Sequence, residues 1–218
     1  MSVKVGLKYI EIWNESMEDA IVSYEKEEAE KGQIVFYGPS YFTRWSPKYG
    51  MRPMREDLLG KSGKPCVINR GFGSSSAEHQ LYYYPRAVRP LEPSVLVYSF
   101  QANGPSFGYS AEESWELAQR VIAYARTDFP DVKIYLCSHT PSRDATLQQK
   151  NEAKKFDSWV KAYTEIVPNC KFIDIAGYEP LATRKDIFVD DGVHYNQTGY
   201  DLFGEFFKKE LEEELAKF

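Results

Sequence analysis

Residues 34–40 have the sequence Ile-Val-Phe-Tyr-Gly-Pro-Ser, an apolar run that breaks into a glycine, a proline and a serine. A run that is apolar at every position, rather than at alternate positions, is typical of a parallel strand whose sheet is covered on both faces. The sequence therefore predicts a strand at about residues 33–38. Similar runs predict four more strands, at about residues 65–69, 94–100, 132–138 and 170–175.

Segments with helical periodicity separate these predicted strands. Gly32 is a plausible C-terminal cap for the first helix, and Ser110 and Glu113 form a capping box at the start of a later one. Alternating strands and helices predict an α/β fold, a three-layer α/β/α sandwich. We expect residues 1–218 to form a single domain, with residues 1–31 as an N-terminal extension and a helix that packs on it. The helices are expected at about residues 15–31, 111–122, 147–166 and 197–218.

Polar residues directly follow three of the predicted strands. Ser40 follows the first, Gly73 and Ser74 lie in a glycine-rich loop after the second, and Asn103 follows the third. The carboxyl ends of parallel strands meet at one edge of the sheet, where open α/β sheets bind their ligands. We therefore expect these residues to lie close together.

Near the C-terminus, Asp191 precedes His194 by three residues. Residues at this spacing share a face of a helical turn, so the carboxylate can hold one ring nitrogen while the other faces a hydroxyl. Serine is a weak nucleophile near neutral pH, so it needs a base in contact with its hydroxyl. That base in turn needs a hydrogen-bond acceptor that fixes its tautomer. Ser40, His194 and Asp191 are thus candidates for a nucleophilic triad, with Asp190 as an alternative orienting carboxylate. Taken singly, Ser40 also fits a helix N-cap and His194 a loop histidine.

In this order, the segments resemble the SGNH, or GDSL-type, esterases and acylhydrolases, from about residue 15 to the C-terminus. That family carries its nucleophile in a Gly-Asp-Ser element, has a late Asp-x-x-His, and uses a glycine-loop amide and an asparagine as oxyanion donors. The resemblance implies that Ser40, Asp191 and His194 are catalytic. It also implies an oxyanion hole formed by Ser40, Ser74 and Asn103, and a five-stranded sheet in the flavodoxin-like order 2-1-3-4-5.

The chain departs from the family pattern in three places. Pro39 stands where the family has the aspartate before its nucleophile, and Ser74 stands where it has a second loop glycine. The block at residues 101–104, Gln-Ala-Asn-Gly, keeps only the asparagine. Ser74 retains its backbone N–H, although its Cβ restricts positive φ angles. The differences bear on substrate class and rate more than on the chemistry.

Gly73, His139 and Arg143 are further candidates for substrate binding. His139 follows the fourth predicted strand and is expected at the rim of the site. Arg143 resembles a residue near the family's active-site rim, and a surface arginine paired with the following aspartate is the alternative. His79 is expected on the surface of a helix, and the three tyrosines at residues 82–84 are expected in the core rather than against a sugar or acyl group.

Composition excludes several classes of protein. The chain has 218 residues, of which 43% are hydrophobic, and this is enough for one full α/β core. A net charge of −5 without a Lys/Arg cluster argues against nucleic acid and anionic membranes as partners. No apolar leader or run of about 18 apolar residues is present, so a cytoplasmic protein is expected. The three cysteines are expected to be reduced, and no metal or organic cofactor is expected.

The function expected from the resemblance is hydrolysis of short-chain O-acyl esters, with acetylated carbohydrates as the first choice. Two alternatives stay open. One is an acylhydrolase of the lysophospholipase or thioesterase type. The other is a catalytically weak homologue that binds acyl or carbohydrate ligands. The expected partner is a small-molecule ester, and assembly into a homo-oligomer stays open.

Overall fold

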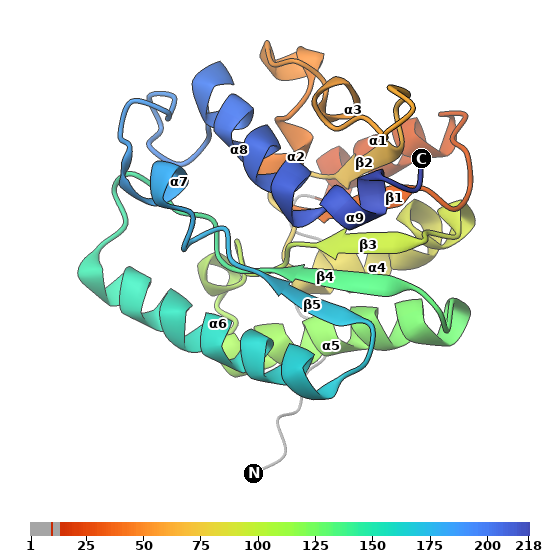
Figure 1. The fold of residues 1–218 in the computed structure, drawn as a ribbon. Coiled ribbons are helices and arrows are strands. Elements are labelled where there is room, and N and C mark those ends of the chain that lie inside the picture. Colours follow the sequence, from red (N-terminus) through yellow and green to blue (C-terminus); the bar gives the residue numbers. More distant parts are fainter. Residues whose placement is uncertain (1–9, 11–13) are drawn as a thin grey trace.

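The computed structural model describes Ile10 and residues 14–218, and a five-stranded parallel sheet lies at its centre (Figure 1). The strands are β1 (Ile34–Gly38), β2 (Val67–Gly71), β3 (Val95–Tyr98), β4 (Lys133–Cys137) and β5 (Cys170–Ile173). Their order across the sheet is β2-β1-β3-β4-β5, and every neighbouring pair is parallel. The predicted α/β/α sandwich and its strand order are confirmed.

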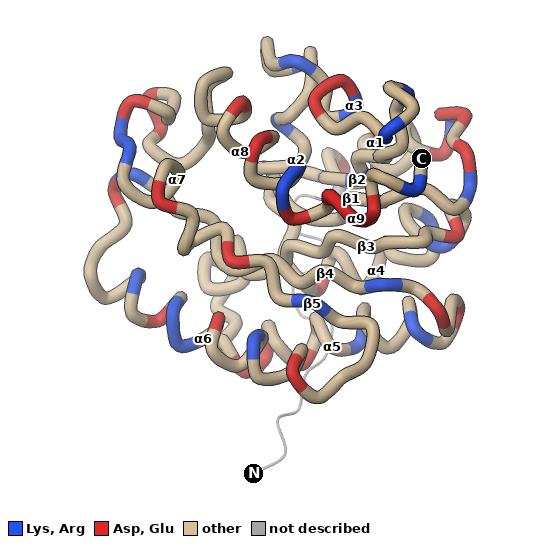
Figure 2. Tube along the Cα trace, in the orientation of Figure 1, with Lys and Arg blue, Asp and Glu red and all other residues tan. Residues whose placement is uncertain are grey.

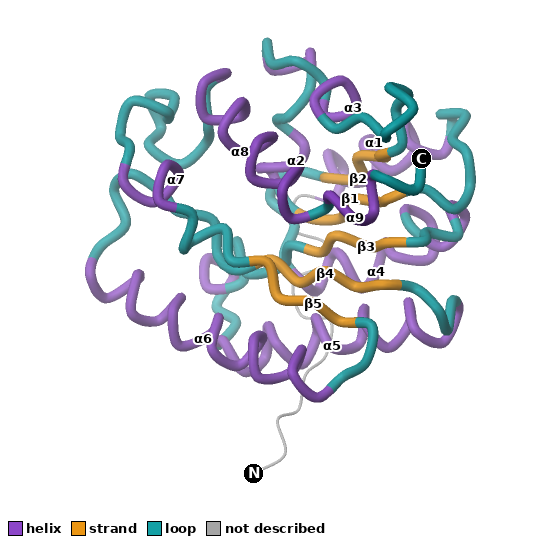
Figure 3. The backbone as a smooth tube through the Cα atoms, in the orientation of Figure 1, coloured by secondary structure: helices purple, strands orange, loops and turns teal. Residues whose placement is uncertain are grey.

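The sheet is buried on both faces, so alternate residues of a strand enter two separate cores. In β1, Val35 and Tyr37 enter the first core, whereas Ile34 and Phe36 enter the second. Figure 3 shows the strands as a layer between helices. The first core is shared with α1 (Asn14–Glu25), α4 (Ala77–Ala87), α5 (Ala111–Asp128) and α6 (Leu147–Ile166). The second core is shared with α2 (Ser40–Thr43), α3 (Met54–Asp57), α7 (Glu179–Thr183), α8 (Gln197–Glu210) and α9 (Glu212–Leu215).

Several helix ends differ from the sequence-based expectation. The first helix ends at Glu25 instead of continuing to residue 31, because residues 26–30 are charged except for one alanine and have little apolar surface to bury. Gly32 has a positive φ of 77° but lies outside the helix. The short helices α2, α3, α7 and α9 were not predicted, since four or five residues carry too little periodicity. Short 3₁₀ turns complete the chain at η1 (Pro47–Tyr49), η2 (Arg89–Leu91) and η3 (Pro105–Phe107).

The expectation that His79 lies on a helix surface is wrong. His79 is fully buried, and its Nδ1 lies 2.9 Å from Ser76 Oγ and accepts the Ser76 N–H at 3.3 Å. The imidazole thus takes the place of the glutamate or glutamine of a capping box at the start of α4. Of the three neighbouring tyrosines, Tyr83 and Tyr84 are in the core as expected, but Tyr82 is 50% exposed.

The junction between β1 and α2 places Ser40 at the carboxyl edge of the sheet, two residues after the strand ends. Gly71 of β2 lies directly against α2. A Cβ at Gly71 would lie 2.5 Å from the Thr43 nitrogen and 2.6 Å from the Phe42 Cβ. Asn69 also donates its side-chain N–H to the Phe42 carbonyl at 2.6 Å. The close approach of β2 therefore leaves α2, and with it Ser40, little freedom to shift.

Charged residues lie mainly on the helices and loops around the sheet, with acidic and basic residues intermixed (Figure 2). Within the part of the chain that the structure describes, no helix combines the length and the apolar character that a bilayer crossing requires.

We expect Gly71→Ala to lower the free energy of unfolding by about 1–3 kcal/mol, because the added methyl group meets backbone that cannot easily move. Gly73→Ala is the matched control, since a Cβ at that position would meet nothing within 4 Å. Its unfolding free energy should stay within about 1 kcal/mol of the wild-type value. Urea unfolding of the three proteins measures both effects, and equal stabilities would contradict the described packing of β2 on α2.

Candidate active site

A pocket of about 1320 Å³ opens at the carboxyl edge of the sheet, where segments far apart in the sequence meet. The pocket brings together six of the residues singled out in the sequence. They are Ser40, Gly73, Ser74, Asn103, His139 and His194. Asp191 lies behind His194, and Arg143 lies outside the pocket lining.

A continuous chain of hydrogen bonds links Ser40, His194 and Asp191. The Ser40 Oγ lies 2.8 Å from the His194 Nε2, and the His194 Nδ1 lies 2.7 Å from the Asp191 Oδ2. A carboxylate only accepts hydrogen bonds, so the Nδ1 carries the proton and the neutral ring offers Nε2 as an acceptor to the serine hydroxyl. The geometry is that of a hydroxyl in contact with an oriented base.

The Asp191 carboxylate is held by three donors from its own loop. Its Oδ1 accepts the backbone N–H groups of Val193 at 2.9 Å and His194 at 2.8 Å, while its Oδ2 accepts the imidazole N–H. Partial burial raises the pKa of Asp191, but the hydrogen bonds from His194 and Val193 outweigh it and lower the pKa to about 2. The carboxylate is therefore ionised throughout the neutral and mildly acidic range.

Arg143, which lies outside the pocket lining, forms hydrogen bonds to the turn that carries Asp191 and His194. The Arg143 backbone N–H donates to the Gly192 carbonyl at 2.8 Å, and its guanidinium donates to the Asp190 carbonyl at 3.1 Å. Gly192 has a φ of 68°, and a Cβ there would lie 2.2 Å from an Asp144 carboxylate oxygen. Arg143 also pairs with Asp144 at 3.1 Å, as the alternative interpretation expected. Asp190 contributes its carbonyl to this turn, and Asp191 holds the imidazole.

Two residues that the sequence did not single out contact His194 and Asp191: Tyr41 of α2 and Arg44, which directly follows α2. The ring of Tyr41 packs against the imidazole of His194, with centroids 5.8 Å apart. Burial, followed by the charge of Asp191, raises the pKa of Tyr41, so its ring stays neutral. The Arg44 guanidinium lies 3.6 Å from the Asp191 Oδ2. Because α2 is only four residues long, no periodicity in the sequence pointed to either residue.

Ser40, Ser74 and Asn103 all line the pocket, and each offers an N–H donor. The backbone N–H groups of Ser40 and Ser74 donate to none of the residues that the structure describes. The Asn103 carboxamide donates one hydrogen bond to the Ser75 carbonyl at 3.0 Å, which leaves its second N–H available. Ser74 and Asn103 have φ angles of 60° and 65°, a conformation that is strained for residues other than glycine. Strain of this kind is often retained at functional sites.

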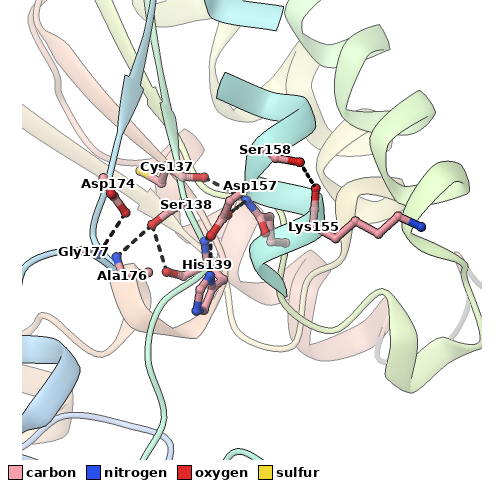
Figure 4. A network of polar contacts seen from close by, with 10 residues as sticks. Cys137, Ser138, His139, Lys155, Asp157, Ser158, Asp174, Ala176 and Gly177 are labelled. Atoms are coloured by element: carbon pink, nitrogen blue, oxygen red, sulfur yellow. Dashed lines mark hydrogen bonds and ion pairs between the residues drawn. The ribbon is translucent and has the colours of Figure 1, made fainter. Parts of the chain in front are cut away.

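The pocket contains a second histidine, His139, which is held by Asp157 of α6 (Figure 4). The sequence indicated only the histidine, because Asp157 is brought to it by tertiary packing from 18 residues away. In the sequence, Asp157 could have been noticed only as a carboxylate next to Phe156 and near Val160, the buried positions of α6.

We expect the Asp191 carboxyl to titrate near pH 2 in the wild-type protein and closer to its ordinary value of 3.8 in His194→Ala. The imidazole hydrogen bond is lost in this variant, whereas both backbone donors remain. Because the folded-state pKa is lowered, the stability that this group contributes is present above about pH 4 and lost as the pH falls toward 2. Carbon-13 NMR of labelled aspartate measures the titration. Val193→Ala keeps its N–H and is the control, and identical titration in His194→Ala and Val193→Ala would contradict the described bond.

Comparisons with a family profile and with solved structures agree with the fold. The sequence profile of the GDSL-like Lipase/Acylhydrolase family matches residues 36–202. No curated protein matches the chain significantly.

Three solved structures show the same fold at low sequence identity. A GDSL-like lipase from Bacteroides thetaiotaomicron has a TM-score of 0.67 at 17% identity, covering 93% of this chain and 98% of its own. The acetyl xylan esterase AlAXEase has a TM-score of 0.65 at 20% identity, covering 82% and 98%. An acetyl-xylooligosaccharide esterase from Geobacillus Stearmophilus has a TM-score of 0.64 at 14% identity, covering 85% of this chain and 96% of its own. With three quarters of its residues matched by the family profile, the chain belongs to the GDSL-like lipase/acylhydrolase family.

Proposed function

We propose that this protein is a serine carboxylic ester hydrolase that acts on short-chain O-acyl esters. The observation that carries the proposal is the hydrogen-bond chain from the Ser40 Oγ through both nitrogens of His194 to Asp191. It supplies a nucleophile, a base in contact with it, and an ionised group that fixes the tautomer of the base.

In the first step, the Ser40 Oγ attacks the carbonyl carbon of the ester while its proton passes to the Nε2 of His194. Asp191, with its pKa lowered to about 2, stays ionised and stabilises the imidazolium that forms. When the tetrahedral intermediate collapses, the bond to the alcohol oxygen breaks. His194 donates its proton to that oxygen, so the alcohol leaves and Ser40 remains acylated.

In the second step, water takes the place of the serine hydroxyl. His194 removes a proton from the water as its oxygen attacks the acyl carbon. Collapse of this second intermediate breaks the bond to the Ser40 Oγ, which recovers its proton from His194, and the carboxylic acid leaves.

The negative charge of both intermediates would be stabilised by the N–H groups of Ser40 and Ser74 and by the Asn103 carboxamide. Loss of one such donor typically costs a factor of about 10²–10³ in rate. Two observations support this assignment: the N–H groups of Ser40 and Ser74 have no acceptor among the described residues, and all three residues line one pocket.

Acetylated carbohydrates are the substrate class that we propose first. The pocket of about 1320 Å³ exceeds the roughly 300–1,000 Å³ of sites for drug-sized ligands, so it holds far more than an acetyl group. Serine, threonine and glutamine side chains recur in its lining, and these suit a hydroxyl-bearing alcohol. Two of the proteins with the same fold are esterases of acetylated xylan or xylooligosaccharides, which supports the choice.

We expect Ser40→Ala to lower the hydrolysis of p-nitrophenyl acetate by at least about 10³-fold, because the nucleophile and base act as a unit. Ser106→Ala is the matched control, since it removes an exposed hydroxyl from the same pocket. Its rate should stay within about twofold of the wild-type rate. Near wild-type turnover by Ser40→Ala would refute the proposed nucleophile. A wild-type protein without turnover would favour a ligand-binding homologue.

A further inference from the structure

A second imidazole and carboxylate pair lies in the same pocket as the proposed triad. The His139 Nδ1 lies 2.5 Å from the Asp157 Oδ2, and the His139 backbone N–H donates to the Asp157 Oδ1 at 2.9 Å. The side chains are only 21% and 13% exposed. The proposed mechanism uses neither residue.

Gln101 completes the support of this pair from the neighbouring strand end. Its side-chain N–H donates to the Asp157 Oδ1 at 2.7 Å, and it also approaches the Cys137 carbonyl at 3.3 Å. The loop itself is fixed by the Ser138 Oγ, which donates to the His139 carbonyl at 3.0 Å and accepts the Ala176 N–H at 2.9 Å (Figure 4). Both the ring and the backbone of His139 are therefore held in place.

This arrangement leaves one nitrogen of the ring free. The Asp157 carboxylate is an acceptor, so the Nδ1 of His139 carries the proton, and the Nε2 of the neutral ring carries a lone pair. Figure 4 shows that the second ring nitrogen points away from Asp157 and α6. It makes no hydrogen bond to any residue in the described part of the chain. A fixed acceptor is thus presented at the wall of the pocket.

The strand order separates the strand that precedes His139 from the strand that precedes the nucleophile. Tyr37 of β1 is level with Tyr98 of β3, which is level with Leu136 of β4. Ser40 and His139 each follow the end of their strand by two residues, and β3 is the one strand that lies between β1 and β4. Two strand spacings of about 4.8 Å separate the ends of β1 and β4 by about 10 Å. The His139 imidazole makes no hydrogen bond to Ser40, His194 or Asp191 among the described residues, so we assign it to the part of the substrate beyond the reacting ester group.

We propose that His139 is a specificity-determining residue that accepts a hydrogen bond from a hydroxyl on the alcohol portion of the substrate. The inference rests on the proposed ester hydrolysis and narrows its substrates to esters of polyols or sugars. Asp157 and Gln101 are positioning residues that act through His139, because they hold its tautomer and orientation. If His139 and Asp157 had a purely structural role, their substitution would change the rate of hydrolysis of all esters alike.

The test compares three acetate esters: a mono-O-acetylated methyl glucoside, cyclohexyl acetate and p-nitrophenyl acetate. The first two have alcohols of similar ring size and differ in their hydroxyl groups. All three esters form the same acetyl-enzyme, so they differ only in the steps up to acylation. Because kcat/KM reports these steps, a difference in the recognition of the alcohol appears in kcat/KM. His139→Phe removes the acceptor, and His139→Gln retains a polar group near the position of Nε2.

We expect His139→Phe to lower kcat/KM for the glucoside ester about tenfold, the effect of one neutral hydrogen bond, and to leave both other esters within about twofold. His139→Gln should restore part of the loss, and Asp157→Asn should show the same selectivity with a smaller loss. Equal effects of His139→Phe on the glucoside and cyclohexyl esters, or no effect on either ester, would overturn the inference. The proposed function would still be upheld in that case if the turnover of p-nitrophenyl acetate depends on Ser40.

A binding measurement separates recognition from catalysis. In Ser40→Ala the glucoside ester is not consumed, so calorimetry can measure its Kd directly. Addition of His139→Phe to this variant should raise the Kd about tenfold for the glucoside ester and leave the Kd of cyclohexyl acetate unchanged. An unchanged Kd for the glucoside ester would overturn the inference, whatever the turnover experiments show about the proposed function.

Discussion

The packing of α2 against the ends of two strands is the constraint on which the site depends. A Cβ at Gly38 would lie 3.0 Å from the Phe42 ring of α2, and a Cβ at Gly71 would lie 2.5 Å from the Thr43 nitrogen. Only glycine at these two positions allows α2 to approach both strands so closely. Since Ser40 is the first residue of α2, this approach places its hydroxyl at the carboxyl edge of the sheet.

The C-terminal part of the chain is tied to the same helix. The Tyr200 hydroxyl of α8 donates to the Tyr41 carbonyl of α2 at 2.9 Å, and the turn with Asp191 and His194 directly precedes α8. The contact between α2 and α8 therefore brings the imidazole to Ser40 across 154 residues of sequence. Both histidines of the pocket are oriented by carboxylates. One lies in contact with the proposed nucleophile, and His139 lies two strands away, which suits contact with the far end of a substrate.

The sequence predicted the strands well, because a parallel sheet buried on both faces leaves a continuous apolar run. The strand order came from the family resemblance, since crossover directions leave no local pattern. The short helix α2 and the burial of His79 were not predicted, because both depend on contacts with residues distant in the chain. The sequence pointed to Ser40 by its place after a strand, and to Asp191 and His194 by their spacing. It did not point to Asp157, because the role of Asp157 depends on how α6 packs beside β5. Arg143 was predicted near the site, and its contacts hold the Asp190–Gly192 turn from outside the pocket.

The central claim is that Ser40 is a nucleophile activated by His194, and covalent labelling tests it most directly. A serine-directed organophosphonate is incubated with the wild-type protein, Ser40→Ala, His194→Ala and the Ser106→Ala control, and the adducts are mapped by peptide mass spectrometry. We predict one adduct per chain, located at Ser40, formed at the same rate in the control, strongly slowed in His194→Ala and absent in Ser40→Ala. An adduct at another residue, or a labelling rate at Ser40 that does not change in His194→Ala, would contradict the account.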